Sequence, residues 1–143
     1  METKFNFKSS VCTSREQSER LLALGLKKET ADMVCTHAYY GTWVVTASEN
    51  PLYEEGDSVP AWSLGRLIEM LPNPIPISEN LPTFHHYAYL NLSNDSVGYY
   101  WEDYDGVGKS LVGFSGKGFF SAVVDATEWL IKEGNFPKEY LEE

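Results

Sequence analysis

Cysteine is scarce in this chain of 143 residues, and the two that are present do not form a metal-binding pattern. Cys12 and Cys35 are not part of a C-x-x-C pair, and their separation matches no common zinc-site spacing. The sequence therefore predicts reduced thiols in a cytoplasmic protein, although two cysteines can pair in an oxidising compartment.

Basic residues are also few, since 11 Lys and Arg stand against 21 Asp and Glu, which gives a net charge of −10. Binding to a nucleic-acid duplex is driven by basic side chains that displace counterions from the phosphates. We therefore expect no direct binding to DNA or RNA. The same charge favours solubility and, alternatively, attraction to a basic surface on a partner.

Long apolar runs are missing. The first ten residues, METKFNFKSS, lack the apolar core of a secretory signal, and no stretch approaches the ~20 apolar residues that span a bilayer. The length suits one domain, and no linker divides it. We expect a single domain over residues 1–143 that lies in the cytoplasm and makes no membrane contact.

The stretch GVGKS, at residues 106–110, looks like the end of a phosphate-binding loop. Such a loop needs the pattern G-x-x-x-x-G-K-[ST], and the position of its first glycine is Asp103, whose carboxylate would repel phosphate. The residues that follow, SLVGFSG, resemble a strand rather than the helix that a phosphate loop opens. We expect a glycine-rich hairpin turn here and predict no cofactor.

The sequence is rich in helix and strand patterns. Three helices are predicted. The first begins in a capping box, formed either by Thr13 with Glu16 or by Ser14 with Gln17, and stops at Gly25. The other two are predicted over residues 60–72 and over residues 116–136. Strands are predicted over residues 37–47, 83–92, 97–105 and 110–115. These elements are segregated along the chain, which favours an α+β fold with a short antiparallel β-meander of three to four strands and helices packed on one face.

Aromatic residues make up 14% of the chain, which is more than a core requires. Because side chains alternate along a strand, half of the strand aromatics should face the helices and half should form an exposed face. The candidate binding residues are Tyr87, Tyr89, Tyr99 and Trp101. An exposed aromatic face of this kind would bind a protein partner or hold a small ligand.

A group of charged residues suggests a different chemistry. Asp103 and Asp105 share a strand face by alternation and are weak candidates for a divalent-cation site. Together with His85 or His86 they suggest a metal-assisted hydrolase. The competing interpretations are a solvated strand end that discourages edge pairing and histidines that only pack among aromatic rings.

Three stretches together support a resemblance: TSREQSERLLALGL with TADM after it, PAWSLGRLIEMLP, and AVVDATEWLIKEG. With these, the chain resembles a group of small proteins carried by bacterial phages and integrated mobile elements. The resemblance implies a cytoplasmic accessory protein that acts in a bacterial host. It brings no catalytic motif, so no functional residue is carried over from it.

These observations favour a non-catalytic binding module that uses an aromatic, acidic surface. The partner would be a protein or a small ligand, and a homodimer is expected because a sheet with one aromatic face often pairs with a second copy. Two alternatives stay open, which are the hydrolase that uses His85 or His86 with Asp103 and Asp105, and a structural or assembly protein without a ligand.

Overall fold

The structure is a computed structural model that describes residues 11–37, 43–47, 58–115 and 117–143. In chain order the described elements are α1 (Arg15–Ala23), the 3-10 turn η1 (Lys28–Thr30), β1 (Met33–His37), β2 (Trp43–Ala47), β3 (Val59–Ala61), α2 (Leu64–Met70), β4 (Ile75–Pro76), β5 (Tyr87–Leu92), β6 (Val97–Glu102), β7 (Gly108–Phe114), α3 (Phe119–Glu133) and the 3-10 turn η2 (Lys138–Tyr140). They make an α+β fold, as the sequence predicts.

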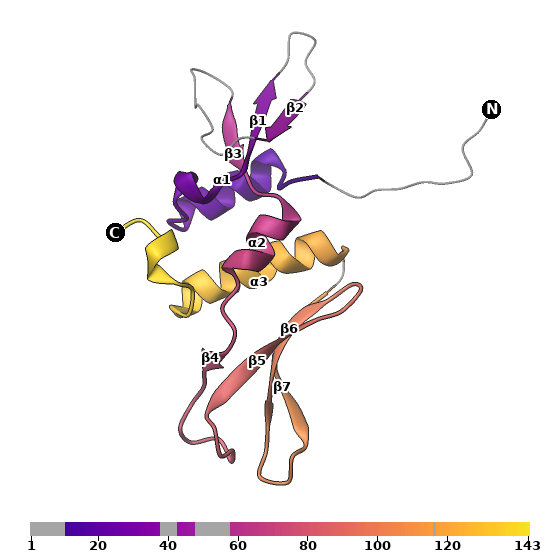
Figure 1. Cartoon of the computed structure of the whole chain (residues 1–143), viewed down its shortest axis with the longest axis vertical. Helices are drawn as coiled ribbons and strands as arrows, with labels where there is room; N and C mark the ends of the chain where they lie inside the picture. The colour runs from indigo at the N-terminus through magenta and orange to yellow at the C-terminus, as the bar shows by residue number, and fades with distance from the viewer. Residues whose placement is uncertain (1–10, 38–42, 48–57, 116) are drawn as a thin grey trace, which may run out of the picture.

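The larger sheet is an antiparallel meander in the order β4-β5-β6-β7 (Figure 1). On β6 the apolar Val97, Tyr99 and Trp101 alternate with Gly98 and exposed positions, so one face of the strand is buried and the other meets solvent. This confirms the predicted meander of consecutive strands.

Helix α3 covers the buried face of this sheet. It contacts β6 and β7, and the ring of Trp129 lies 6.4 Å from that of Tyr99 and 6.1 Å from that of Phe114. The short helix α2 packs on α3, and Leu67 of α2 is fully buried (Figure 1). One main core therefore runs from α1 through α2 and α3 to the sheet, and it includes Phe136, which follows α3 in the chain.

Helix α1 begins in one of the two predicted capping boxes. The Ser14 side chain accepts from the backbone N–H of Gln17, and the Gln17 side chain accepts from the backbone N–H of Ser14. Thr13 lies inside instead, where its hydroxyl accepts from the backbone N–H of Trp62 at 3.0 Å. The predicted stop at Gly25 is confirmed, since this residue has a φ of +101° just after the helix.

A second sheet, in the order β2-β1-β3, was not anticipated from the sequence. The prediction of one strand over residues 37–47 is wrong, because His37 ends β1 and Trp43 begins an antiparallel partner, β2. The predicted start of the second helix at residue 60 is also wrong, because β3 extends to Ala61 and the helix begins only after Ser63. The Ser63 side chain caps that helix and itself donates to Asp32.

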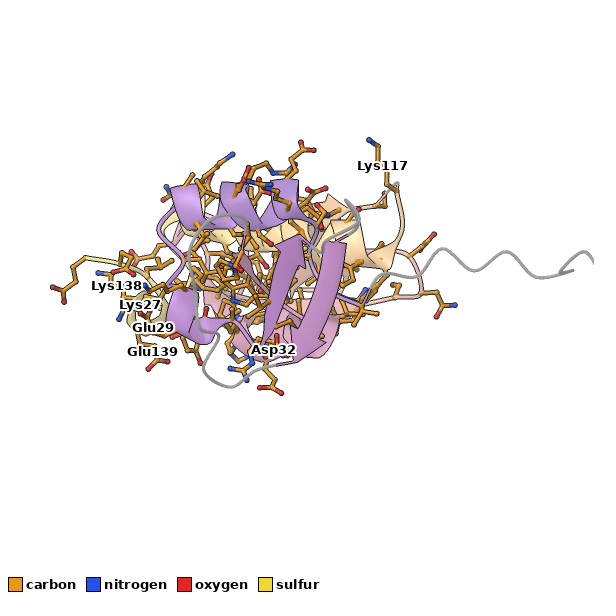
Figure 2. The ribbon with its side chains drawn as sticks, turned by 90° about the horizontal axis from the view of Figure 1, so that it is seen from above. Lys27, Glu29, Asp32, Lys117, Lys138 and Glu139 are labelled. Carbon is orange, nitrogen blue, oxygen red and sulfur yellow. The ribbon has the colours of Figure 1, made fainter. Side chains whose placement is uncertain are left out.

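Charged residues gather at one end of the molecule, where the segment after α1 meets the C-terminal turn η2 (Figure 2). The backbone N–H of Lys27 donates to the carbonyl of Tyr140 at 2.8 Å, and Lys27 Nζ donates to the carbonyl of Glu139 at 3.1 Å. Lys117 stands at the opposite side and points outward (Figure 2). The two hydrogen bonds of Lys27 hold the C-terminal turn η2 against the segment that follows α1.

No helix of the described residues has the length and apolarity needed to cross a membrane.

Candidate functional site

The outer face of β5 and β6, which faces away from α3, carries three exposed tyrosines that we call the tyrosine face: Tyr87, Tyr89 and Tyr100. Their exposed fractions are 48%, 40% and 39%. Tyr89 and Tyr100 stand directly opposite each other across the two strands, with ring centroids 6.1 Å apart. Exposed aromatic rings that gather on one face of a sheet often mark an interaction site.

The tyrosine face borders a hollow of about 310 Å³, which we call the tyrosine hollow. It is lined by Thr83, His85, Tyr87, Tyr89, Tyr100 and Glu102. Thr83 is buried, whereas the three tyrosines, His85 and Glu102 are exposed to solvent. The hollow thus combines three aromatic walls with one carboxylate and one imidazole, a set that can hold a small group by stacking and by charge.

Two more exposed rings lie beyond the strand ends. The rings of Phe84 and Tyr104 meet edge to face, with centroids 4.7 Å apart. Tyr104 belongs to the connection between β6 and β7, and Phe84 lies just before β5, so the pair joins two loops at this end of the sheet. The strand predicted over residues 83–92 begins only at Tyr87, and Phe84 in the segment before it is strongly exposed.

The other two candidate binding residues lie on the opposite face of the sheet. Tyr99 is 1% exposed and Trp101 is 8% exposed, and both belong to the main core. The Tyr99 hydroxyl donates to the carbonyl of Pro72 at 2.8 Å, and burial raises the pKa of this hydroxyl well above its usual value. Tyr99 and Trp101 therefore stabilise the fold from inside and do not share a surface with Tyr87 and Tyr89.

Sequence reasoning missed three members of the hollow, Thr83, Tyr100 and Glu102. A signal for the last two was present, because Gly98, Tyr100 and Glu102 form the polar or small half of the alternation on β6, while Val97 and Tyr99 form the apolar half. The polar half of a strand with one buried face is the half that meets solvent.

A second hollow, of about 520 Å³, lies beside the first over β6 and β7. Gly98 and Gly113, which face each other across the two strands, leave this part of the outer face without side chains. Tyr100 lines both hollows and so stands between them.

The connection between β6 and β7 is organised by Asp103. Its Oδ1 accepts from the backbone N–H groups of Asp105 and Val107, both at 2.9 Å, and its Oδ2 lies 3.9 Å from Lys109 Nζ. Lys109 is a residue of β7 and not the start of a helix. The predicted hairpin turn is confirmed, and the lysine of GVGKS faces a carboxylate.

The four residues of the hydrolase hypothesis do not converge. His85 lines the tyrosine hollow, whereas His86 Nδ1 lies 3.4 Å from the carbonyl oxygen of Ser78. Asp103 is engaged in its turn, and Asp105 is exposed beside it. Within residues 11–37, 43–47, 58–115 and 117–143, no three His, Cys, Asp or Glu side chains are grouped so that they could hold a metal ion.

The two cysteines are buried as free thiols in a small cluster around Ala61. Burial, and then the nearby Cys35 and Asp32, raise the pKa of the Cys12 thiol from 9.0 to about 11. Because the thiolate is the nucleophile, this environment suits a packing role.

Comparisons with protein-family models, with curated proteins and with solved structures find no match to this chain. The function is therefore inferred from the geometry of the tyrosine face and its hollow.

Proposed function

We propose that this protein is a non-catalytic binding module whose recognition surface is the tyrosine face. The observation that carries the proposal is the position of Tyr87, Tyr89 and Tyr100, which remain exposed on the side of the sheet opposite α3 and border the tyrosine hollow. Tyrosine brings a large contact area with few rotatable bonds, which makes it a frequent residue at binding surfaces.

The ligand that this surface suits best is a segment of a basic protein. The chain carries a net charge of −10, and Glu102 adds a negative charge directly at the hollow. Opposite charge on the partner would speed association and exclude acidic competitors. In line with the resemblance to mobile-element proteins, we propose a component of a bacterial host cell as the partner and the cytoplasm as the place of the encounter.

A peptide selection tests this proposal. Random peptides are selected on the purified chain and then measured against the face variant Tyr87→Ser/Tyr89→Ser/Tyr100→Ser. The matched control is Val107→Ser/Leu111→Ser, which removes two exposed apolar side chains outside the tyrosine hollow. We expect the face variant to lose at least ~10-fold in affinity and the control to bind like the wild type. Equal binding by the face variant, or no specific peptide at all, would contradict the proposal.

A second candidate function, assembly through self-association, is favoured by a different observation. β7 is the last strand of the larger sheet, and its outer edge pairs with no strand of the described residues. An unpaired strand edge can hydrogen-bond to the same edge of another copy. Light scattering over a range of concentrations should then show a dimer, and a monomer at every concentration would contradict assembly through this edge.

A further inference from the structure

We propose that the tyrosine hollow binds the side chain of an arginine within a basic segment of the partner protein. This inference rests on the proposed function and names the chemical group that the surface would recognise. It follows from the aromatic walls of the hollow, from its single carboxylate and from its size.

The walls favour a cation. The faces of aromatic rings carry negative electrostatic potential, so a cation within about 6 Å of a ring centroid is attracted to it. Tyr89 and Tyr100 lie side by side, with centroids 6.1 Å apart, and Tyr87 lines the same hollow. A cation that enters the hollow would contact these rings from more than one direction. Cages of several aromatic rings recognise quaternary ammonium groups by the same attraction.

The hollow carries a negative charge, which is opposite to the charge of a cationic ligand. Glu102 lines the hollow and forms no ion pair with any residue that the structure describes. The lysine of the neighbouring strand, Lys109, lies near Asp103 and not near Glu102. Glu102 is therefore available to a cation that comes from outside.

Arginine fits better than lysine for two reasons. The guanidinium is planar, so it can stack on a tyrosine ring while its edge presents two parallel N–H donors to one carboxylate. It is also more weakly hydrated than an ammonium group, so its transfer from water to an aromatic hollow costs less free energy. The volume of about 310 Å³ is at the small end for a ligand site, which suits one side chain rather than a nucleotide.

The test is a titration followed by the backbone amide resonances of the full chain. The probe is the tripeptide N-acetyl-Gly-Arg-Gly-amide, and its matched partner contains citrulline, which keeps the planar shape but has no charge. We expect the arginine peptide to bind at least ~10-fold more tightly, with the largest shifts at residues that line the hollow. A lysine peptide should bind more weakly than the arginine peptide.

Two variants locate the effect. Glu102→Gln keeps the shape of the side chain and removes its charge, and we expect it to lower the affinity for the arginine peptide by ~10-fold. Asp105→Asn removes an exposed negative charge outside the hollow and should leave the affinity unchanged. Tyr100→Leu keeps an apolar side chain without the aromatic ring, and it should weaken arginine binding while the chain stays folded.

The possible results separate this inference from the proposed function. If arginine and citrulline peptides bind equally, or if lysine binds as tightly as arginine, the inference is overturned. Library-selected peptides that still need the tyrosine face would then leave the proposed function standing. If neither tripeptide binds and the library also gives no peptide that needs the tyrosine face, both proposals fall.

Discussion

The two faces of β6 use the same kind of residue for opposite purposes. Tyr99 and Tyr100 are neighbours in the chain, yet Tyr99 is buried against Trp129 with its hydroxyl bonded to Pro72, and Tyr100 stands in solvent opposite Tyr89. The difference arises from the two-residue repeat of a strand, which turns successive side chains to opposite faces. Residue type alone therefore does not say which tyrosine holds the fold together and which is available to a partner.

The largest expected contrast comes from removal of each ring. Tyr99→Ala should lower the free energy of unfolding by about 3–5 kcal/mol, because it leaves a cavity under α3. Tyr100→Ala should lower it by less than about 1 kcal/mol, because the ring is already partly in water. Urea unfolding of the two variants measures the difference. Equal losses would show that the two faces of β6 are not divided in this way.

A second contrast concerns Gly98 and Gly113, which face each other on β6 and β7. A Cβ added at Gly98 would come within 2.9 Å of the carbonyl oxygen of Val112, whereas a Cβ added at Gly113 meets nothing within 4 Å. We expect Gly98→Ala to destabilise the chain by about 1–3 kcal/mol and Gly113→Ala to be near neutral. Thermal unfolding of both variants gives the comparison, and a stable Gly98→Ala variant would mean that the strands lie further apart.

A third and smaller contrast depends on pH. In the folded chain the pKa of Cys12 is raised from 9.0 to about 11, and the pKa of Tyr99 is also raised. Above pH 9 the folded chain therefore keeps protons that the unfolded chain has released. The unfolded state then binds fewer protons, so the free energy of unfolding falls as the pH rises. The contribution of Cys12 is complete below about pH 9 and is lost as the pH rises to about 11, whereas the contribution of Tyr99 begins to be lost only above about pH 10.

Matched variants show which face of β6 causes this fall in the free energy of unfolding. Tyr99→Phe removes the buried hydroxyl, so its unfolding free energy should fall less steeply above pH 10 than that of the wild type. The matched control is Tyr100→Phe, which removes an exposed hydroxyl on the other face of β6. Urea unfolding at pH 8, 10 and 11 provides the measurement, and identical slopes for the two variants would contradict a buried Tyr99 hydroxyl.

Much of the larger sheet and its helix could be predicted from the sequence, because their patterns are local. The alternation of Tyr87, Ala88 and Tyr89 and the apolar helix repeat within residues 116–136 are both read from neighbouring residues. The alternation on β6 also signals that Tyr100 and Glu102 meet solvent, but the residues of β5 that they meet could not be read in this way, because that depends on how β5 and β6 align. Tyr89 pairs with Tyr100, so odd-numbered residues of β5 share a face with even-numbered residues of β6.

The smaller sheet was missed for a related reason. Its strands β1, β2 and β3 are short, and β3 contains Pro60, which a strand tolerates at a sheet edge. The pairing of β1 with β3 joins segments that are far apart in the chain, and it is supported by contacts such as the hydrogen bond from the backbone N–H of Ser63 to Asp32. Such contacts leave no periodic signal in a single sequence.

Hydroxyl-radical footprinting by mass spectrometry, with and without a library-selected peptide, tests the division between the two faces most directly. In the free chain we predict strong labelling of Tyr87, Tyr89 and Tyr100 and little labelling of Tyr99. The bound peptide should protect the first three and leave Tyr99 unchanged. Labelling of Tyr99 as strong as that of Tyr100, or a bound peptide that leaves the tyrosine face unprotected, would contradict recognition through this face.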